Sequence, residues 1–333
     1  MFKYILKRIG AAILILLGVS FILYALLRCM PTDFVEAKIL ALNTSGATVT
    51  EEFKQQMYKT YGLDGTIVQG YFSWLGNVCH LNFGKSFINQ REVLSEVFDP
   101  GRIGTSFIVA AVSTVFEFLI AIPLGITAAT HQYSLRDYVV TILVLIGISL
   151  PSFFFGQLLK DIFANKLDWF PVGQMKTAGV PMVGLEKFGD YLWHMFLPVL
   201  TVVILSIGAR MRTTRTNMLE VLNADYIRTA RAKGLAKRSV NVKHALRNAM
   251  LPVSTVIGLQ FGSLLGGALL TETVFAWPGI GKFAVDCVLK SDFPVVQGVV
   301  LLVAVIFVFM NLLVDIIYAW LDPRIKYGAK EEG

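Results

Sequence analysis

Residues 103–130 read I-G-T-S-F-I-V-A-A-V-S-T-V-F-E-F-L-I-A-I-P-L-G-I-T-A-A-T, and Glu117 carries the one charged side chain in the run. The hydrocarbon core of a bilayer is about 30 Å thick, and roughly 20 consecutive apolar residues in a helix cross it. This run is therefore long and apolar enough to span a membrane. A carboxylate at the centre of such a helix costs about 3 kcal/mol to insert, so we expect Glu117 to face the interior of a helix bundle.

Five more stretches contain no Asp, Glu, Lys or Arg: residues 9–27, 138–159, 191–209, 248–271 and 293–314. The chain of 333 residues is 55% hydrophobic and 16% charged, whereas soluble proteins carry about 25% charged residues. The stretches also lack the alternating pattern, about ten residues long, of barrel strands. The sequence predicts an all-α integral membrane protein with six transmembrane helices.

The distribution of Lys and Arg predicts the orientation of these helices, because cytoplasmic loops carry an excess of both. With the N-terminus inside, the cytoplasmic segments hold 17 basic and six acidic residues, and the outer segments hold 12 basic and 14 acidic residues. We therefore expect both termini in the cytoplasm. The first apolar run is longer than the apolar region of about 7–15 residues in a secretory signal, so we expect it to stay as a transmembrane helix.

Four regions follow from this topology. Residues 1–30 form the N-terminal transmembrane helix, residues 31–101 an extracytoplasmic segment, residues 102–321 a five-helix core with a cytoplasmic loop at 210–250, and residues 322–333 a cytoplasmic tail. Within the outer segment, Thr48 and Glu51 have capping-box spacing and predict a short helix that ends at Gly62. Glu272 and Asp315 lie near the ends of spans, where we expect them at the water interface.

The residues predict no catalysis and no metal site in this chain. Gly84-Lys85-Ser86 resembles the end of a phosphate-binding loop, but the glycine required at position 79 is Cys79. The four histidines have no partner at metal-ligand spacing. Cys79 and Cys287 both fall outside, where they either pair or remain as two free thiols. The positive net charge of +7 follows from membrane topology and does not indicate nucleic-acid binding.

The cytoplasmic loop carries the strongest functional signal. Ten basic and two acidic residues lie between Arg210 and Arg247. The sequence predicts a helix over residues 219–234. One side of this helix carries an apolar stripe of Leu219, Leu222, Tyr226 and Ala230. Gly234 is predicted to end the helix. Such a helix either lies on the lipid surface or docks its apolar side into a groove on a cytoplasmic partner.

The sequence of this loop resembles that of the coupling loop of binding-protein-dependent ABC importer permeases, in the form found in the peptide and nickel subgroup. The match covers D-Y-I-R-T-A-R-A-K-G-L at 225–235 and H-A-L-R-N-A-M-L-P at 244–252. In the broader superfamily, Glu and Ala stand where this chain has Arg228 and Thr229. The resemblance continues in F-K-Y-I-L-K-R-I at 2–9, Y-G-L-D at 61–64, F-G-K-S at 83–86, E-T-V-F-A-W-P-G-I-G at 272–281, F-P-V-V-Q-G at 293–298 and L-D-P-R at 321–324.

This resemblance implies a type I ABC importer permease fold and the B-type membrane subunit of an oligopeptide or dipeptide importer. It further implies a heterodimer with a C-type permease, two cytoplasmic ATPases that bind the ATP and Mg²⁺, and an external solute-binding protein, all at the cytoplasmic membrane of a prokaryote. No cofactor is expected in this chain. The residues implied to couple it to the ATPases are Leu222, Asp225, Tyr226, Arg228, Thr229, Ala230, Arg231, Gly234 and Leu235.

The fifth span carries candidates for the translocation path. Small residues recur at every fourth position there, which either lets helices pack closely or leaves room for a substrate of varied shape. The candidate residues are Ser254, Gly258, Gln260, Phe261, Gly262, Ser263 and Gly266. Pro151 is expected to kink the third span. Glu117 either binds a peptide amine or pairs with a Ser, Thr or Arg of a neighbouring helix.

Three functions remain possible on the sequence alone. The first is the membrane subunit of an ATP-driven peptide importer, into which energy enters only through the coupling helix. The second is a permease for nickel or a nickel chelate, although the spans contain no His or Cys cluster. The third is a stand-alone secondary transporter or channel, a class that often shows two inverted halves; this sequence shows no internal repeat.

Overall fold

The structure is a computed structural model that describes residues 2–29, 34–44, 49–60, 65–250 and 269–321. Its first half contains α1 (Phe2–Arg28), α2 (Phe34–Thr44), α3 (Glu51–Thr60), α4 (Ile67–Cys79), α5 (Val93–Val97), α6 (Pro100–Thr130), α7 (Leu135–Ser149), α8 (Ser152–Leu159) and the π-helical turn η1 (Lys160–Lys166). The second half contains α9 (Gly184–Leu222), α10 (Asp225–Ala232), α11 (Lys237–Ser239), the π-helical η2 (Val240–Leu246), α13 (Leu269–Val274), α14 (Ile280–Leu289) and α15 (Phe293–Leu321). The described residues contain no β-strand, only one antiparallel bridge between Lys85 and Glu92.

Four stretches of helix in the described part of the chain are long and apolar enough to cross a membrane. They are Leu6–Arg28, Val93–Thr130, Gly184–Leu222 and Phe293–Leu313, and they coincide with the first, second, fourth and sixth predicted spans. The all-helical fold is thus confirmed. Most of the predicted fifth span, residues 251–268, lies outside the described residues, which include its first three residues, 248–250, and its last three, at the start of α13.

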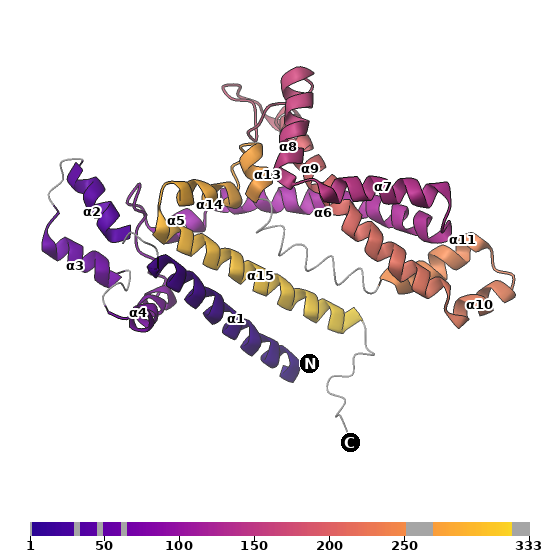
Figure 1. The fold of residues 1–333 in the computed structure, drawn as a ribbon, viewed down its shortest axis with the longest axis horizontal. Helices are drawn as coiled ribbons and strands as arrows, with labels where there is room; N and C mark the ends of the chain where they lie inside the picture. Colours follow the sequence, from indigo (N-terminus) through magenta and orange to yellow (C-terminus); the bar gives the residue numbers. More distant parts are fainter. Residues whose placement is uncertain (1, 30–33, 45–48, 61–64, 251–268, 322–333) are drawn as a thin grey trace.

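The predicted third span is divided between two helices. Helix α7 ends at Ser149, and α8 begins at Ser152 and takes a different direction from α7 (Figure 1). Between them Leu150 is extended, with φ −92° and ψ 133°. A proline lacks the N–H that would continue the helix and pushes the residue before it towards extended backbone. Pro151 therefore produces a full break in this span, which is a larger effect than the predicted kink.

Helices α6 and α9 form the centre of the molecule and run in the same direction. Near their beginnings Val109 and Val199 belong to one buried cluster, and near their ends Ala129 and Met218 belong to another. Gly125 permits this close packing, because a Cβ at that position would overlap the side chain of Thr214. A small residue at the crossing point is how membrane helices bring their backbones together.

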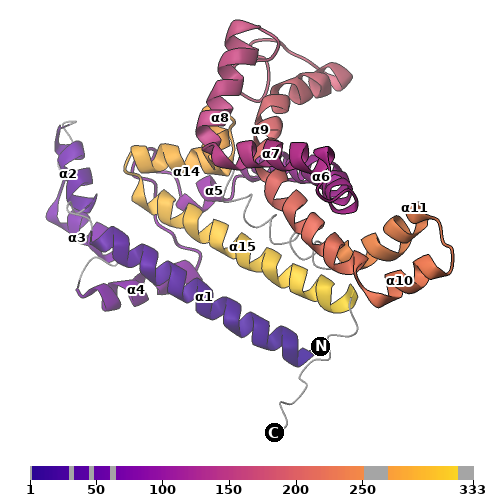
Figure 2. The same cartoon turned by 45° about the vertical axis from the view of Figure 1, so that its right-hand side comes forward.

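A second pair of helices, α1 and α15, packs side by side (Figure 1), and α15 also contacts α5 and α14. The two run in opposite directions, so the first residues of α1 and the last residues of α15 lie at the same end of the molecule. Helix α10 is at that same end in Figure 2. The opposite end holds α2, α3, α5, α14 and the first turns of α15.

Candidate functional site

The helical loop after α9 is positioned by two breaks in the helix. Helix α9 ends at Leu222, and extended backbone at Ala224, with φ −71° and ψ 148°, then redirects the chain into α10. At the other end Gly234 has φ +74°, a conformation that L side chains avoid. Its N–H donates to the carbonyl of Arg231, and the N–H of Leu235 donates to that of Ala230. This pair of hydrogen bonds is a Schellman motif, so the predicted stop at Gly234 is confirmed.

One face of α10 is buried against η2, in a cluster that also contains residues from the ends of α6 and α9. Ile227 is fully buried and Ala230 nearly so. They belong to a cluster of buried residues that we call the anchor cluster: Ala129, Met218, Ile227, Ala230, Val240, Ala245 and Ala249. Leu219 and Leu222 pack against it while partly exposed. A fully buried Ile, Val or Met side chain contributes about 1.5–3 kcal/mol, so Ile227, Val240 and Met218 account for most of the stability of this cluster, which joins α10 to η2 and to the ends of the two long helices.

The predicted stripe was wrong at Tyr226, whose side chain is 47% exposed. The prediction assumed one continuous helix from Leu219 to Gly234. The turn at Asn223 and Ala224 ends that helix and shifts the phase of the next one. The buried position in α10 is consequently Ile227, one residue further along the chain. Ala230 and Leu222 do lie on the buried side.

The other face of α10 is exposed and mostly polar. Tyr226, Arg228, Thr229 and Arg231 are all exposed there. Asp225 and Arg228 form an exposed ion pair at 3.5 Å, and the hydroxyl of Thr229 donates to the carbonyl of Asp225 at 3.0 Å. Leu235 is exposed just beyond the end of α10. The helix thus presents an aromatic ring and cationic groups on a surface that its buried face fixes in place.

An ion pair ties the first turn of α7 to the last third of α9. Arg215 donates to Asp137 through Nε at 3.1 Å and through Nη2 at 2.9 Å. Burial of Asp137 favours its neutral form, but the hydrogen bonds from Arg215 and from the Tyr133 N–H outweigh this effect. Together with the Arg215 charge they hold the pKa of Asp137 below its ordinary value. The pair fixes the α6–α7 turn beside the loop that carries α10.

Glu117 lies on α6 with no exposed surface, as its position in an apolar span requires. Its Oε1 accepts a hydrogen bond from Nε of Arg210 on α9 at 3.0 Å. The two charges therefore neutralise each other across the α6–α9 interface. This geometry corresponds to the pairing alternative that the sequence left open. The remaining path candidates, Ser254, Gly258, Gln260, Phe261, Gly262, Ser263 and Gly266, lie outside the described residues.

A buried carboxylate near the opposite end was not foreseen. Glu272 is 1% exposed, so its expected position at the water interface was wrong. One oxygen accepts from Ser106 at 2.6 Å and the other from the N–H of Lys282 at 2.9 Å, and the Ser106 hydroxyl accepts from the N–H of Ile280. Helix α14 has no side-chain cap of its own. Glu272 therefore caps α14 from another helix, at the end where the helix dipole favours negative charge.

Two sequence motifs that lie far apart in the chain meet at this end. Ser86 donates to Asp292 at 2.5 Å, and the N–H of Phe87 donates to the same carboxylate at 2.8 Å. A Cβ at Gly298 would overlap Val93, so the glycine lets α15 approach α5. Phe-Gly-Lys-Ser at 83–86 and Phe-Pro-Val-Val-Gln-Gly at 293–298 thus form one packing unit. The sequence could not show this contact, because the two motifs lie at opposite ends of the chain.

The two cysteines that were predicted to lie outside, Cys79 and Cys287, are both free. Cys79 is exposed on α4, and Cys287 is buried on α14. Burial and the nearby Asp292 carboxylate raise the pKa of the Cys287 thiol to about 12. A thiol reacts through its thiolate, so of these two cysteines Cys79 is the reactive one.

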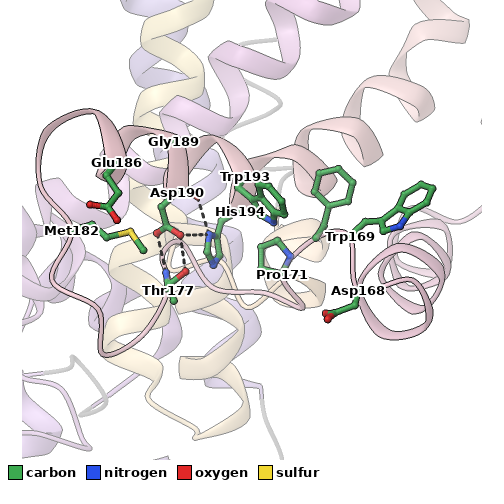
Figure 3. A pocket seen from close by; sticks show the side chains of 11 residues that line it. Asp168, Trp169, Pro171, Thr177, Met182, Glu186, Gly189, Asp190, Trp193 and His194 are labelled. Carbon is green, nitrogen blue, oxygen red and sulfur yellow. Dashed lines mark hydrogen bonds and ion pairs between the residues drawn. The ribbon is translucent and has the colours of Figure 1, made fainter.

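A pocket of about 430 Å³ lies between the first turns of α9 and the segment that precedes it (Figure 3). Asp190 accepts hydrogen bonds from the N–H and hydroxyl of Thr177 at 2.9 and 2.7 Å, and it lies 3.3 Å from Nδ1 of His194. Trp169 and Trp193 line the other side of the pocket. The hydrogen bonds fasten the irregular segment to α9, which gives Asp190 and His194 a structural role.

Comparison with known proteins matches almost the whole chain to one family. Residues 121–327 match the model of the binding-protein-dependent transport system inner membrane component, and residues 1–110 match the N-terminal model of such membrane components. Among structures, the chain is similar to one from the inward-facing MetNI methionine ABC transporter, with a TM-score of 0.55 and 14% identity. That likeness covers 67% of this chain and 95% of the other and shows a shared fold.

Several curated relatives match over the full length. The oligopeptide transport system permease AppB of Bacillus subtilis (strain 168) is 36% identical, covering 98% of this chain and all of the relative. The dipeptide permease DppB of Escherichia coli (strain K12) and the di/tripeptide permease DppB of Pseudomonas aeruginosa (strain UCBPP-PA14) are also 36% identical, over 98% of this chain and 99% of each relative. With its helical architecture and these matches, the chain belongs to the family of binding-protein-dependent transport system inner membrane components.

Proposed function

We propose that this chain is a membrane subunit of an ATP-driven importer of peptides delivered by a solute-binding protein. Family membership and three full-length relatives named as oligopeptide, dipeptide or di/tripeptide permeases support this function. Nickel transport has no support among these names. A stand-alone transporter is not favoured either, because the family is defined by dependence on a binding protein.

The topology is part of the proposal. Six spans cross the cytoplasmic membrane of a prokaryote, with both termini and α10 on the cytoplasmic side. The excess of basic residues in the predicted inner segments supports this orientation. So does the arrangement in Figure 2, where the beginning of α1, the end of α15 and α10 lie at one end of the molecule.

The observation that carries the coupling mechanism is the two-faced structure of α10. Ile227 and Ala230 lie in the anchor cluster with η2 and the ends of α6 and α9. Tyr226, Arg228 and Arg231 are exposed on the other face. A push on the outward face is therefore transmitted to two long helices that run in parallel through the apolar region. Energy enters the chain at α10, and the nucleotide and its Mg²⁺ belong to the partner ATPases.

The complete assembly contains this chain, a second permease of the C-type, two cytoplasmic ATPases and an extracytoplasmic binding protein. ATP binding draws the ATPases together and moves α10, and the spans turn from inward-facing to outward-facing. A loaded binding protein then releases its peptide into the cavity between the two permeases. Nucleic acid has no part in this cycle.

Reconstitution tests the proposal directly. The chain alone and the complete assembly are placed in separate liposomes, and uptake of a labelled tripeptide or of Ni²⁺ is measured with and without ATP. Peptide uptake that requires ATP, the ATPases and the binding protein is the expected result. Gradient-driven transport by the chain alone, or uptake of nickel in place of peptide, contradicts it.

A further inference from the structure

Helix α4 differs from the rest of the segment between α1 and α6. Residues 65–84 contain no Asp, Glu, Lys or Arg, and His80 is the one titratable imidazole among them. By contrast α3 carries Glu51, Glu52, Lys54 and Lys59 within ten residues. A charge-free helix of 13 residues is too short to cross a bilayer, and segments of this length are often interfacial or re-entrant. We propose that α4 is embedded in the outer leaflet of the membrane and contacts lipid acyl chains.

The depth of α4 follows from its contacts with α1. The hydroxyl of Tyr71 donates to the carbonyl of Leu17 at 3.1 Å and lies 2.9 Å from the hydroxyl of Ser20. Leu17 is the central residue of the apolar span Leu6–Arg28. At 1.5 Å per residue it lies about 16 Å below Arg28 along the helix axis, which is roughly half of the hydrocarbon thickness. Tyr71 therefore reaches towards the middle of the bilayer.

Contacts at both ends of α4 show where the chain enters and leaves this depth. Arg28, at the outer end of α1, donates to the carbonyl of Gly65 just before α4. After α4, Phe83 lies near Gly298 in the second turn of α15. Between these points Trp74 and Tyr71 cluster with Tyr24 of α1 and with the partly buried Leu301 of α15. Contacts with both α1 and α15 thus place α4 within the outer leaflet, where it lies beside the outer half of α1 (Figure 2).

The surface of α4 that faces away from the protein suits lipid. Phe72 is 64% exposed and Val68 is 53% exposed. Phe72 and the exposed Phe21 of α1 both make ring contacts with Tyr71, so the apolar surface continues from α1 onto α4. Two N–H groups at the start of α4, those of Thr66 and Gln69, are paired with side chains in a capping box. Such internal pairing is what a helix needs where water is scarce.

The test uses collisional quenching of a fluorophore in the complete transporter, reconstituted in phosphatidylcholine nanodiscs. The three native cysteines are replaced by Ser, and bimane is attached at Phe72→Cys, at Val68→Cys and at the control Gln55→Cys on the exposed, charged helix α3. Doxyl-labelled phosphatidylcholine quenches from the bilayer, and iodide quenches from water.

We expect doxyl lipid to quench the labels at positions 68 and 72 several-fold more strongly than the label at 55, and iodide to show the reverse order. Equal iodide quenching at all three positions would overturn the proposal. So would quenching of positions 68 and 72 by neither agent, because this result would mean that another subunit covers α4. As an independent readout, Phe72→Asp should lower the yield of assembled transporter several-fold, while the matched change Phe53→Asp on α3 leaves the yield unchanged.

Discussion

Nε of Arg210 lies 3.0 Å from Oε1 of Glu117, a carboxylate with no exposed surface in the middle of an apolar span. The pair joins α6 to α9, whose last turns both contribute to the anchor cluster around α10. An isolated charge is costly in this environment, so each residue depends on the other. This relationship connects the transmembrane core with the proposed route of coupling.

Removing one member of this pair should destabilise the transporter. Glu117→Gln leaves Arg210 without its counter-charge; because the Arg210 side chain is 22% exposed, the cost should lie below the value of about 3–5 kcal/mol for a fully buried pair. We expect a clear fall in the thermal midpoint of the purified complex and recovery of most of the loss in the double variant Glu117→Gln, Arg210→Met. An unchanged midpoint with a raised KM for peptide would instead indicate that Glu117 binds substrate.

The Asp137–Arg215 pair makes a prediction about pH. Because the folded pKa of Asp137 is lowered, its stabilising effect is present above the unfolded value of about 3.9 and is lost as the pH falls through the folded value. Asp137→Asn should lower stability by about 1–3 kcal/mol at pH 7. The difference from the wild type should persist down to pH 5 and shrink below pH 4, as followed by thermal unfolding. A difference that grows on acidification would contradict this assignment.

Glycine at position 279 should be essential for the Glu272 cap. A methyl group there would overlap the carboxyl group of Glu272, so Gly279→Ala should reduce the yield of folded protein severely. The control is Gly189→Ala on α9, where a Cβ meets no atom within 4 Å; helix propensity favours this change by about 1 kcal/mol. Equal yields of the two variants would show that Glu272 does not occupy this position.

The exposed face of α10 should be needed for assembly with the ATPases. Tyr226→Ala removes its one exposed aromatic ring while leaving Ile227 and Ala230 in place, so the fold should be unaffected. We expect weaker retention of the ATPase subunits during affinity purification and unchanged thermal unfolding of the permease. Full retention of the ATPases by both Tyr226→Ala and Arg228→Ala would contradict docking through this face.

The sequence predicted the elements that depend on local composition. Apolar runs with at most one charged residue located four long helices, and Gly234 located the end of α10. Pro151 located the interruption of the third span, which is a break where a kink was predicted. It failed where tertiary contacts decide the outcome. The burial of Glu272 depends on Ser106 and on the start of α14, which lie in other parts of the chain. Ile227 is buried in place of the predicted Tyr226 because the helix is interrupted by a two-residue turn, which the periodicity of apolar residues does not reveal.

The position of α4 shows the same limit. Helix α4 was not predicted, although residues 65–84 contain no charged side chain. Their depth relative to α1 becomes apparent only from the hydrogen bond between Tyr71 and Leu17, because a helix of 13 residues satisfies no span criterion on its own.

The central claim is that α10 transmits motion to α6 and α9 through the anchor cluster. The most direct measurement is the number of peptides imported per ATP hydrolysed by the complete reconstituted transporter carrying Ile227→Ala, with Arg238→Ala on the exposed side of the same loop as control. The cavity left by Ile227→Ala loosens α10 from both helices. The account predicts that Ile227→Ala still assembles and hydrolyses ATP but imports several-fold fewer peptides per ATP, whereas Arg238→Ala matches the wild type. An unchanged ratio for Ile227→Ala would contradict the account.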